Sequence, residues 1–291
     1  MIAINSGFHS VLASPDDVLS AIAHAGFEGV LWSQMGKGDF HYLPEERKAI
    51  VKSFRQYGLR AASVHAAEPF RRLYYSENPW YRKAGVELLL NRMELASELE
   101  CPVVVFHAPS PFPTDTTAIF AGLDETLRRG ERLGVLLAIE NGETEEVLPI
   151  LQRYSPRLMG YAYDSGHAFC QGNAESLHRL CFSRLATVHL HDNDGIHDQH
   201  KMPFTGSIDW NAEAVKLAEA GWKGGALLEV SEKCHRATSQ EAFLRQAHRQ
   251  GVRLERLLGN AIASHRKVQS GDDVAKGNNL EMENIKYESL L

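Results

Sequence analysis

Cysteine is scarce in this chain, and its thiols do not form a recognisable disulfide or metal motif. The 291 residues include 4 cysteines, and no two of them make a CxxC pair. The first ten residues have neither a basic region nor a long apolar run, unlike a secretory signal peptide. We therefore expect a cytoplasmic protein with reduced thiols.

Long hydrophobic runs and an excess of positive charge are also missing. No stretch of about 18 apolar residues occurs, which argues against a membrane-spanning helix. The chain has 31 Lys+Arg against 37 Asp+Glu, a net charge of −6. Neither a membrane nor nucleic acid is therefore an expected partner. With 44% hydrophobic and 23% charged residues, the composition is typical of a globular protein with a normal core.

Short apolar segments alternate with longer amphipathic ones up to about residue 262. Helical segments begin at signals such as Ser14-Pro15 and Asn78-Pro79, and a glycine often follows the last turn, as at Gly58. The expected strands are Ile2–Asn5, Gly29–Trp32, Arg60–His65, Pro102–His107, Val135–Glu140, Leu158–Asp164, Leu185–His191 and Gly225–Glu229. Seven helical segments separate these strands, and a last helix is expected near Gln240–Leu258. This series predicts an α/β fold, a single-domain (β/α)8 TIM barrel over residues 1–262.

Residues 263–291 have a different composition. They are rich in Asn, Asp, Glu, Lys and Ser, with only scattered apolar positions. Such a polar C-terminal extension is either disordered or a strap laid across a neighbour, and we expect an ordered, peripheral segment. A homo-oligomer, either a dimer or a tetramer, is the corresponding expectation.

Potential metal ligands end six successive strands of the predicted barrel. They are His65, His107, Glu140, Asp164, His191 and Glu229. The C-terminal strand ends form the active-site face of a TIM barrel, so these side chains should converge there. Counting back by two from Glu140 and Asp164 reaches Ala138 and Ala162, which places the polar residues in the inward-facing row. Imidazole and carboxylate ligands without a thiolate suit Zn²⁺, Mn²⁺ or a similar divalent ion.

Two loop motifs add further candidates. In Asp164-Ser165-Gly166-His167 a histidine follows the strand-end aspartate by three residues. It could bind a second ion or a substrate hydroxyl, or simply lie at the start of a helix.

The segment after the seventh strand is rich in histidine and aspartate. His189 shares the inward face with His191, and Asp198 and His200 point to one side of an extended loop. Asp192 and Asp194 are expected to belong to a solvated acidic loop.

The order and spacing of these motifs resemble the xylose isomerase-like TIM-barrel superfamily, which includes sugar (phosphate) isomerases and epimerases and endonuclease IV. The resemblance covers about residues 1–262. In the isomerase and epimerase branch it implies one divalent ion, Zn²⁺ or Mn²⁺, held by Glu140, Asp164, His191 and Glu229. It also implies that Glu140 and Glu229 are paired acid and base groups acting on a sugar, sugar phosphate or polyol through a metal-stabilised cis-enediolate.

The endonuclease IV branch gives the alternative. There the resemblance implies up to three zinc ions and cleavage of abasic DNA, with additional ligands at His65, His107, His167, Asp198 and His200. In the isomerase branch these five residues bind the substrate or orient the ligands. Instead of a Gly-rich turn, residues 201–207 follow His200, and the loop after the seventh strand is acidic, which phosphates disfavour. Arg71, Arg72 and Lys201 are the basic residues nearest the predicted mouth. The sequence thus favours an isomerase or epimerase over an endonuclease, and a non-catalytic barrel is a third hypothesis.

Overall fold

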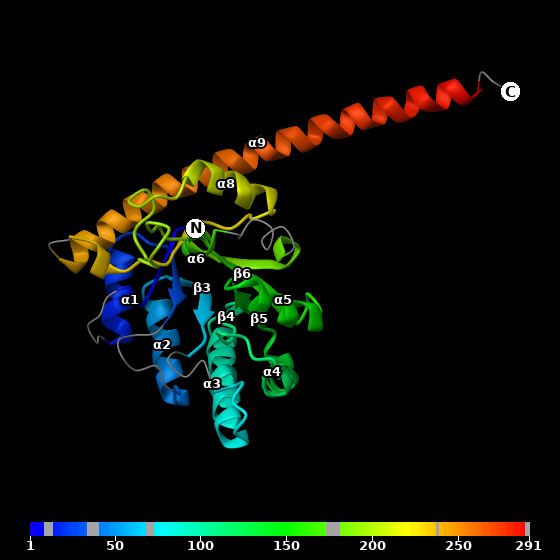
Figure 1. Ribbon diagram of the computed structural model, residues 1–291. Coiled ribbons are helices and arrows are strands. Elements are labelled where there is room, and N and C mark those ends of the chain that lie inside the picture. Colours follow the sequence, from blue (N-terminus) through cyan, green and yellow to red (C-terminus); the bar gives the residue numbers. More distant parts are fainter. Residues whose placement is uncertain (9–13, 34–40, 68–72, 173–180, 237–238, 289–291) are drawn as a thin grey trace.

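The parallel strands of the computed structural model form one sheet in the order β7-β6-β5-β4-β3-β2-β1-β8 (Figure 1). The structure describes residues 1–291 except 9–13, 34–40, 68–72, 173–180, 237–238 and 289–291, and it describes side chains as far as residue 268. The strands are β1 (Ala3–Asn5), β2 (Gly29–Trp32), β3 (Arg60–His65), β4 (Val103–Phe106), β5 (Leu136–Glu140), β6 (Met159–Asp164), β7 (Leu185–His189) and β8 (Leu227–Leu228). A parallel bridge between Leu190 and Leu228 joins the two ends of the sheet. The predicted TIM barrel is therefore confirmed.

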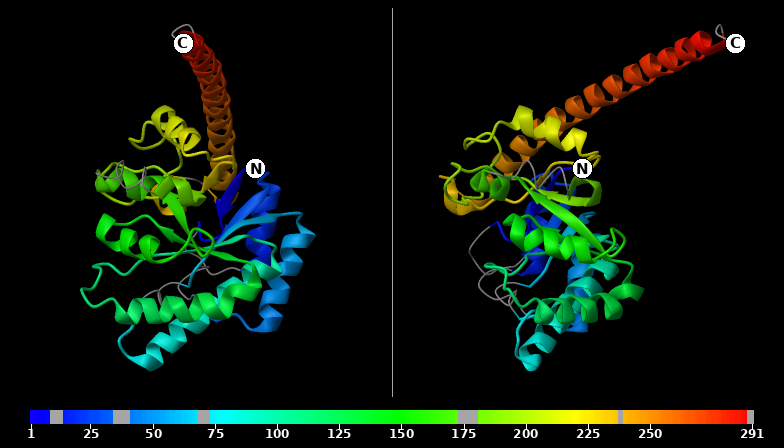
Figure 2. Two further views of the ribbon diagram at one scale, coloured as in Figure 1. Left: turned by 90° about the vertical axis from the view of Figure 1, so that its right-hand side faces the viewer. Right: turned by 45° about the vertical axis from the view of Figure 1, so that its right-hand side comes forward.

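Helices surround the sheet, as the alternating sequence pattern predicts (Figure 2). The described helices are α1 (Pro15–His24), α2 (Pro44–Gln56), α3 (Pro79–Glu98), α4 (Thr117–Gly130), α5 (Thr144–Arg153), α6 (Ser165–Gln171), α8 (Trp210–Glu219) and α9 (Gln240–Glu288). Short 3₁₀ turns lie at Glu131–Leu133, Phe182–Arg184 and Glu232–Cys234. No helix within the described part of the chain is both long and apolar enough to cross a membrane.

The helix starts follow from side-chain capping. Ser14 accepts a hydrogen bond from the backbone N–H of Asp17, and Asn78 accepts one from Trp80. Gly58 follows α2 with a φ of 65°, a conformation that other residues adopt only with strain. The sequence signals therefore fix these helix boundaries through local chemistry.

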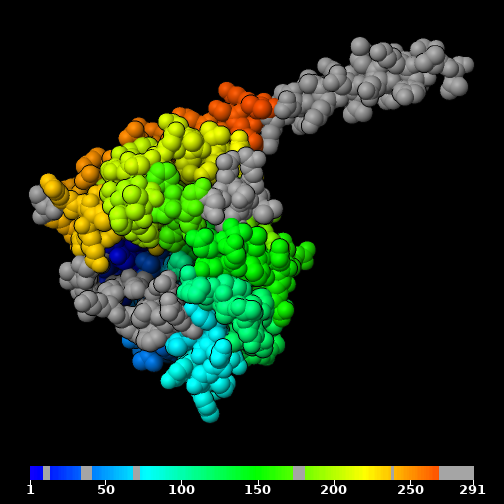
Figure 3. All heavy atoms as spheres, viewed as in Figure 1, coloured from blue at the N-terminus to red at the C-terminus, as the bar shows by residue number. Residues whose placement is uncertain are grey.

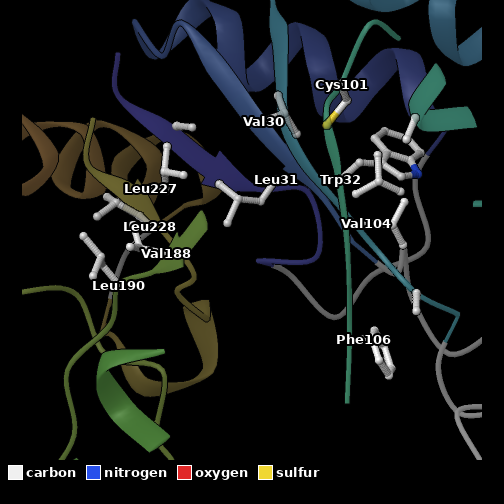
Figure 4. Close-up of a cluster of buried hydrophobic side chains, with 14 of the residues drawn as sticks. Val30, Leu31, Trp32, Cys101, Val104, Phe106, Val188, Leu190, Leu227 and Leu228 are labelled. Carbon is white, nitrogen blue, oxygen red and sulfur yellow. The ribbon is translucent and has the colours of Figure 1, made fainter. Parts of the chain in front are cut away.

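Alternation along the strands separates two apolar layers. Ala138 and Ala162 pack with small neighbours in a cluster inside the barrel, whereas Ile139 and Tyr161 belong to the larger core under the helices. Figure 4 shows part of that larger core, with Val104 close to Trp32 and with side chains of β7 beside those of β8. The inward row predicted for β5 and β6 is thus the observed one.

Helix α9 is much longer than the helices that cover the barrel. Its first part packs mainly on α8, and the two helices cover the same side of the molecule (Figure 3). Leu258 is the last buried side chain among those described, and beyond it the helix runs away from the barrel (Figures 1 and 2). The predicted boundary at residue 262 falls inside this continuous helix, so the division into a barrel and a tail stays a prediction.

Candidate metal centre and active site

A cavity of about 330 Å³ opens at the carboxyl ends of the strands. Its lining combines neutral polar groups with candidate ligands: Asn5, Gly7, Ser33, His65, His107, Glu140, His167, Asp198, His200, Glu229, Val230 and Ser231. All five residues predicted as additional ligands or substrate contacts line it. Among these lining residues none is Lys or Arg. Arg71 and Arg72, the basic pair noted in the sequence, lie outside the described residues.

Glu140 stands at the centre of a ring of histidines. Its Oε2 lies 3.4 Å from Nε2 of His65 and 3.4 Å from Nε2 of His107. Its Oε1 lies 3.3 Å from Nδ1 of His189 and 3.5 Å from Nδ1 of His167. A single carboxylate at the end of β5 therefore lies among histidines from β3, from the residue after β4, from β7 and from helix α6.

Asp164 and Asp198 organise a second part of the cluster. His191 Nε2 lies 3.0 Å from Oδ1 of Asp164 and 3.5 Å from Oδ1 of Asp198. The Oδ2 atom of Asp198 lies 3.3 Å from Nε2 of His167 and 3.1 Å from Nε2 of His200. His191 is fully buried, and its ring stacks on that of His200 with centroids 4.0 Å apart.

Three groups of these side chains have ligand atoms close enough to share a metal ion. In each group, one ligand atom per residue lies within 4.8 Å of all the others. The groups are His65, His107 and Glu140; then Glu140, Asp164, His189 and Glu229; then His167, Asp198 and His200. The four-residue group contains three of the four ligands predicted from the sequence, with His189 in the place expected for His191.

Strand register explains why His189, and not His191, lies in the four-residue group. Both side chains face inward, so alternation alone does not choose between them. The pairing of β6 with β7 shifts between Tyr161 and Ala162, and beyond this shift Asp164 is aligned with His189. His189 therefore lies level with Asp164, and its Nδ1 is 2.8 Å from Oε2 of Glu229. His191 lies farther along, against Asp164 and Asp198.

The chemistry of the four-residue group fits a divalent cation. Asp164 Oδ2 is a buried carboxylate oxygen that has no hydrogen-bond partner among the described residues. Burying such an oxygen without a partner is costly, and a cation would satisfy it. Three carboxylates and one imidazole are also a ligand set that Zn²⁺ and Mn²⁺ accept. The residues that would hold the ion are Glu140, Asp164, His189 and Glu229.

Opposite charges shift the pKa values of the cluster in opposite directions. Burial favours the neutral form of Glu140, but His107 and His189 outweigh it and hold the pKa of Glu140 well below its usual value. Burial also disfavours protonated His189, yet the carboxylates of Glu229 and Glu140 raise the pKa of His189 well above its usual value. His200 behaves similarly: its hydrogen bond with Asp198 outweighs burial and raises its pKa to about 9. Protons on His189 and His200 therefore offset part of the negative charge of these carboxylates.

Asp192 is buried, and the expectation of a solvated position is wrong. Its Oδ1 accepts hydrogen bonds from the backbone N–H groups of Asn193 and Ile208, and its Oδ2 accepts one from Nε1 of Trp210. A backbone pair with Lys201 closes the loop between them. Asp192 therefore anchors the loop that carries Asp198 and His200. Charge spacing does not predict this role, because the partners lie up to 18 residues away in the chain.

Two residues of this loop have an unusual backbone conformation. His200 has a φ of 47° and Phe204 a φ of 69°, in the left-handed region that is strained for side chains other than glycine. The strain at His200 coincides with a hydrogen-bond contact of 3.0 Å between its Nδ1 and the carbonyl oxygen of Glu229. This contact leaves Nε2 of His200 directed at Asp198. Where the sequence departs from a Gly-rich turn, the loop thus still adopts glycine-like backbone angles at Phe204.

The chain thus combines a (β/α)8 barrel with a cluster of histidines and carboxylates at the carboxyl ends of its strands. The family model described as "Xylose isomerase-like TIM barrel" matches residues 19–252, and the chain belongs to this family. The resemblance noted in the sequence is therefore confirmed.

Relatives with similar sequences include two uncharacterised proteins. The protein y4fM of Sinorhizobium fredii is 27% identical over 278 residues, which are 84% of this chain and 89% of that protein. The protein MJ1311 of Methanocaldococcus jannaschii is 29% identical over 246 residues, which are 77% of this chain and 82% of that protein.

Similar solved structures include several epimerases. A D-tagatose 3-epimerase-like protein matches with a TM-score of 0.68 and 23% identity, covering 90% of this chain and 100% of that one. An L-ribulose 3-epimerase matches with a TM-score of 0.67 and 17% identity, covering 92% of this chain and 97% of that one. The 3-keto-D-glucoside 4-epimerase YcjR of E. coli matches with a TM-score of 0.63 and 15% identity, covering 86% and 98%. At these identities the likeness establishes the fold.

Proposed function

We propose that this protein is a divalent-metal-dependent isomerase or epimerase of a small sugar or polyol. The observation that supports this most strongly is the convergence of Glu140, Asp164, His189 and Glu229, whose ligand atoms lie within 4.8 Å of one another. The group borders a cavity of about 330 Å³, a volume suited to a small molecule. The epimerases among the structural neighbours act on sugars, as their names state, and agree with this reading.

The lining suggests how a sugar would be held. Ser33 and Ser231 offer hydroxyl groups, and the histidines offer ring nitrogens, all of which can bind hydroxyls of a neutral substrate. Without a cation among the described lining residues, we favour an unphosphorylated sugar or polyol over a sugar phosphate.

The chemistry proposed is proton transfer at a carbon beside a carbonyl group. A bound divalent ion would supply polarisation of that carbonyl and of a neighbouring hydroxyl. One of the two carboxylates, Glu140 or Glu229, takes the proton from the carbon, and a proton is then returned either to the same carbon or to its neighbour. The low pKa of both groups keeps them ionised and able to accept this proton, with Glu140 set by His107 and His189, and Glu229 mainly by His189.

Solvent exchange tests this proposal directly. The metal-loaded protein, incubated in deuterium oxide with ketoses and with ketones derived from polyols, should introduce deuterium at a carbon beside the carbonyl. Glu229→Gln should slow this exchange by about 10²-fold or more. Glu146→Gln is the matched control, because Glu146 is also a buried carboxylate but belongs to none of the three ligand groups. Absence of exchange with every sugar in a metal-replete sample would contradict the proposal.

The second candidate is a zinc phosphodiesterase acting on abasic DNA. It is favoured by the two further ligand groups, one around His65 and His107 and the other around His167 and His200. Elemental analysis separates the candidates: about one ion per chain favours the isomerase, and about three zinc ions favour the phosphodiesterase. The latter also predicts cleavage of an abasic duplex with strongly salt-dependent binding.

A further inference from the structure

A buried asparagine side chain joins the ends of β5 and β6 where their backbone bonds stop. The backbone bonds between these strands extend as far as the one from the N–H of Asn141 to the carbonyl oxygen of Ala162. Beyond it, the Asn141 side chain bonds both backbone groups of Asp164. Its Oδ1 accepts from the N–H, and its Nδ2 donates to the carbonyl oxygen at 3.0 Å. Because both ends of the amide are used, its orientation is fixed.

A buried serine repeats this arrangement between β6 and β7. The strand register ends where Asp164 is paired with His189. The hydroxyl of Ser165 then donates to the carbonyl oxygen of His191 at 2.9 Å and accepts from its N–H at 3.0 Å. Asn141 follows Glu140, and Ser165 follows Asp164. In each case, the residue after a candidate ligand holds the backbone at the end of the next strand.

Both side chains act on the carboxylate of Asp164. Asn141 holds its backbone directly. Ser165 holds His191, and Nε2 of His191 lies 3.0 Å from Oδ1 of Asp164. The same Oδ1 accepts the backbone N–H of His167 at 2.7 Å. Oδ2 is buried and has no hydrogen-bond partner among the described residues, so it is the oxygen of Asp164 available to a cation.

We propose that Asn141 and Ser165 are positioning residues that fix the direction in which Asp164 presents Oδ2 to the metal ion. This inference rests on the proposed divalent-metal site. Neither residue is a ligand, since the polar atoms of each side chain already bond backbone groups of the next segment. Partners that hold a ligand in its bound orientation raise the affinity for the ion, because less freedom is lost when the ion binds.

The metal affinity of the full-length protein tests the proposal. Competition with a chromophoric chelator for Zn²⁺ and Mn²⁺ should show a loss of about 10- to 100-fold in Asn141→Ala and of about 10-fold in Ser165→Ala. Ser165→Thr keeps the hydroxyl and should recover most of the wild-type affinity. At saturating Mn²⁺, the EPR spectrum of Asn141→Ala should differ from that of the wild type, because Asp164 then has a different orientation.

A double-mutant cycle tests whether Ser165 acts through His191. The variant Ser165→Ala/His191→Ala should bind the ion no more weakly than His191→Ala alone, because the ring that Ser165 positions is then absent. Additive losses would overturn the role of Ser165. If Asn141→Ala does not fold, this cycle and the rescue by Ser165→Thr decide the proposal.

Ser6 provides a matched control. Beyond the paired residues of β1 and β2, its hydroxyl donates to the carbonyl oxygen of Ser33 at 3.0 Å and accepts from its N–H at 2.9 Å. Ser6 is fully buried, and neither serine belongs to a ligand group. Ser6→Ala should lower Tm about as much as Ser165→Ala, since each leaves the same two backbone groups unpaired. It should leave the metal affinity unchanged.

The outcomes separate this inference from the proposed function. A wild-type chain that binds no divalent ion tightly would overturn both. Wild-type affinity in folded Asn141→Ala and Ser165→Ala would overturn only the positioning roles, as would an equal loss of affinity in Ser6→Ala. Circular dichroism of the metal-free variants shows which of them are folded.

Discussion

The Nδ1 atom of His189 lies 2.8 Å from Oε2 of Glu229 and 3.3 Å from Oε1 of Glu140. This fully buried imidazole therefore connects the two carboxylates proposed to exchange protons with the substrate. His191, two residues along, contacts neither of them among the ion pairs of the described residues. The two histidines should thus respond differently to substitution.

His189→Ala should lower the affinity of the chain for Zn²⁺ or Mn²⁺ by more than about 10²-fold, because it removes a ligand from the four-residue group. His191→Ala should lower it by about 10-fold, since His191 acts through its contacts with Asp164 and Asp198. Competition with a chromophoric chelator measures both affinities. If His191→Ala had the larger effect, the assignment of His191 based on the sequence would be preferred.

Asp192→Ala should destabilise the protein strongly, because it leaves three donors without their acceptor, on Asn193, Ile208 and Trp210. The expected loss is about 3 kcal/mol or more in the free energy of unfolding, which corresponds to a fall in Tm of roughly 10 °C. Asp194→Ala is the control: it removes acceptors from Ile196 and His197 at an exposed site and should cost less than about 1 kcal/mol. Thermal unfolding of both variants tests this contrast.

Stability of the metal-free protein should fall as pH rises above neutrality. The folded-state pKa of His200 is raised to about 9, above the unfolded value of about 6.5. The stability it contributes is therefore complete below about pH 6.5 and is lost as pH rises through 9. The pKa of Asp198 is lowered, so its contribution is lost instead in acid.

Thermal unfolding of chelator-treated protein between pH 6 and pH 10 checks the alkaline loss. The variant His200→Gln should show a smaller decline over this range, because it cannot release the proton. An equal decline in the variant and the wild type would assign the loss to other groups.

Gly166→Ala should destabilise the protein and disturb His191. A Cβ atom at position 166 would lie 1.9 Å from Cε1 of His191, so the ring must move, at a cost of about 1–3 kcal/mol. Gly259→Ala in α9 meets no atom within 4 Å and should stabilise the helix by up to about 1 kcal/mol. Opposite shifts of Tm in the two variants are the expected result.

Local chemistry made the barrel predictable from the sequence. Capping residues such as Ser14 and terminators such as Gly58 act over a few positions, and strand alternation placed Ala138 and Ala162 inside. The cavity also contains every one of the additional candidates expected from strand ends and loops.

What the sequence did not reveal depends on longer-range geometry. The position of His189 level with Asp164 follows from a register shift between β6 and β7, which no pattern within β7 encodes. Burial of Asp192 depends on Ile208 and Trp210 folding back over it. Both features depend on contacts between segments that are far apart in the sequence, so local patterns do not predict them.

The bridge at Leu190 and Leu228 gives the metal centre a mechanical consequence. Strands β7 and β8 are joined there by two backbone hydrogen bonds, one from the N–H of Leu190 to the oxygen of Leu227 and one from Glu229 to Leu190. A single bridged pair of residues therefore closes the barrel between β7 and β8. His189 ends β7 and Glu229 follows β8. An ion bound to both side chains would therefore cross-link these two strands and stabilise the closed barrel.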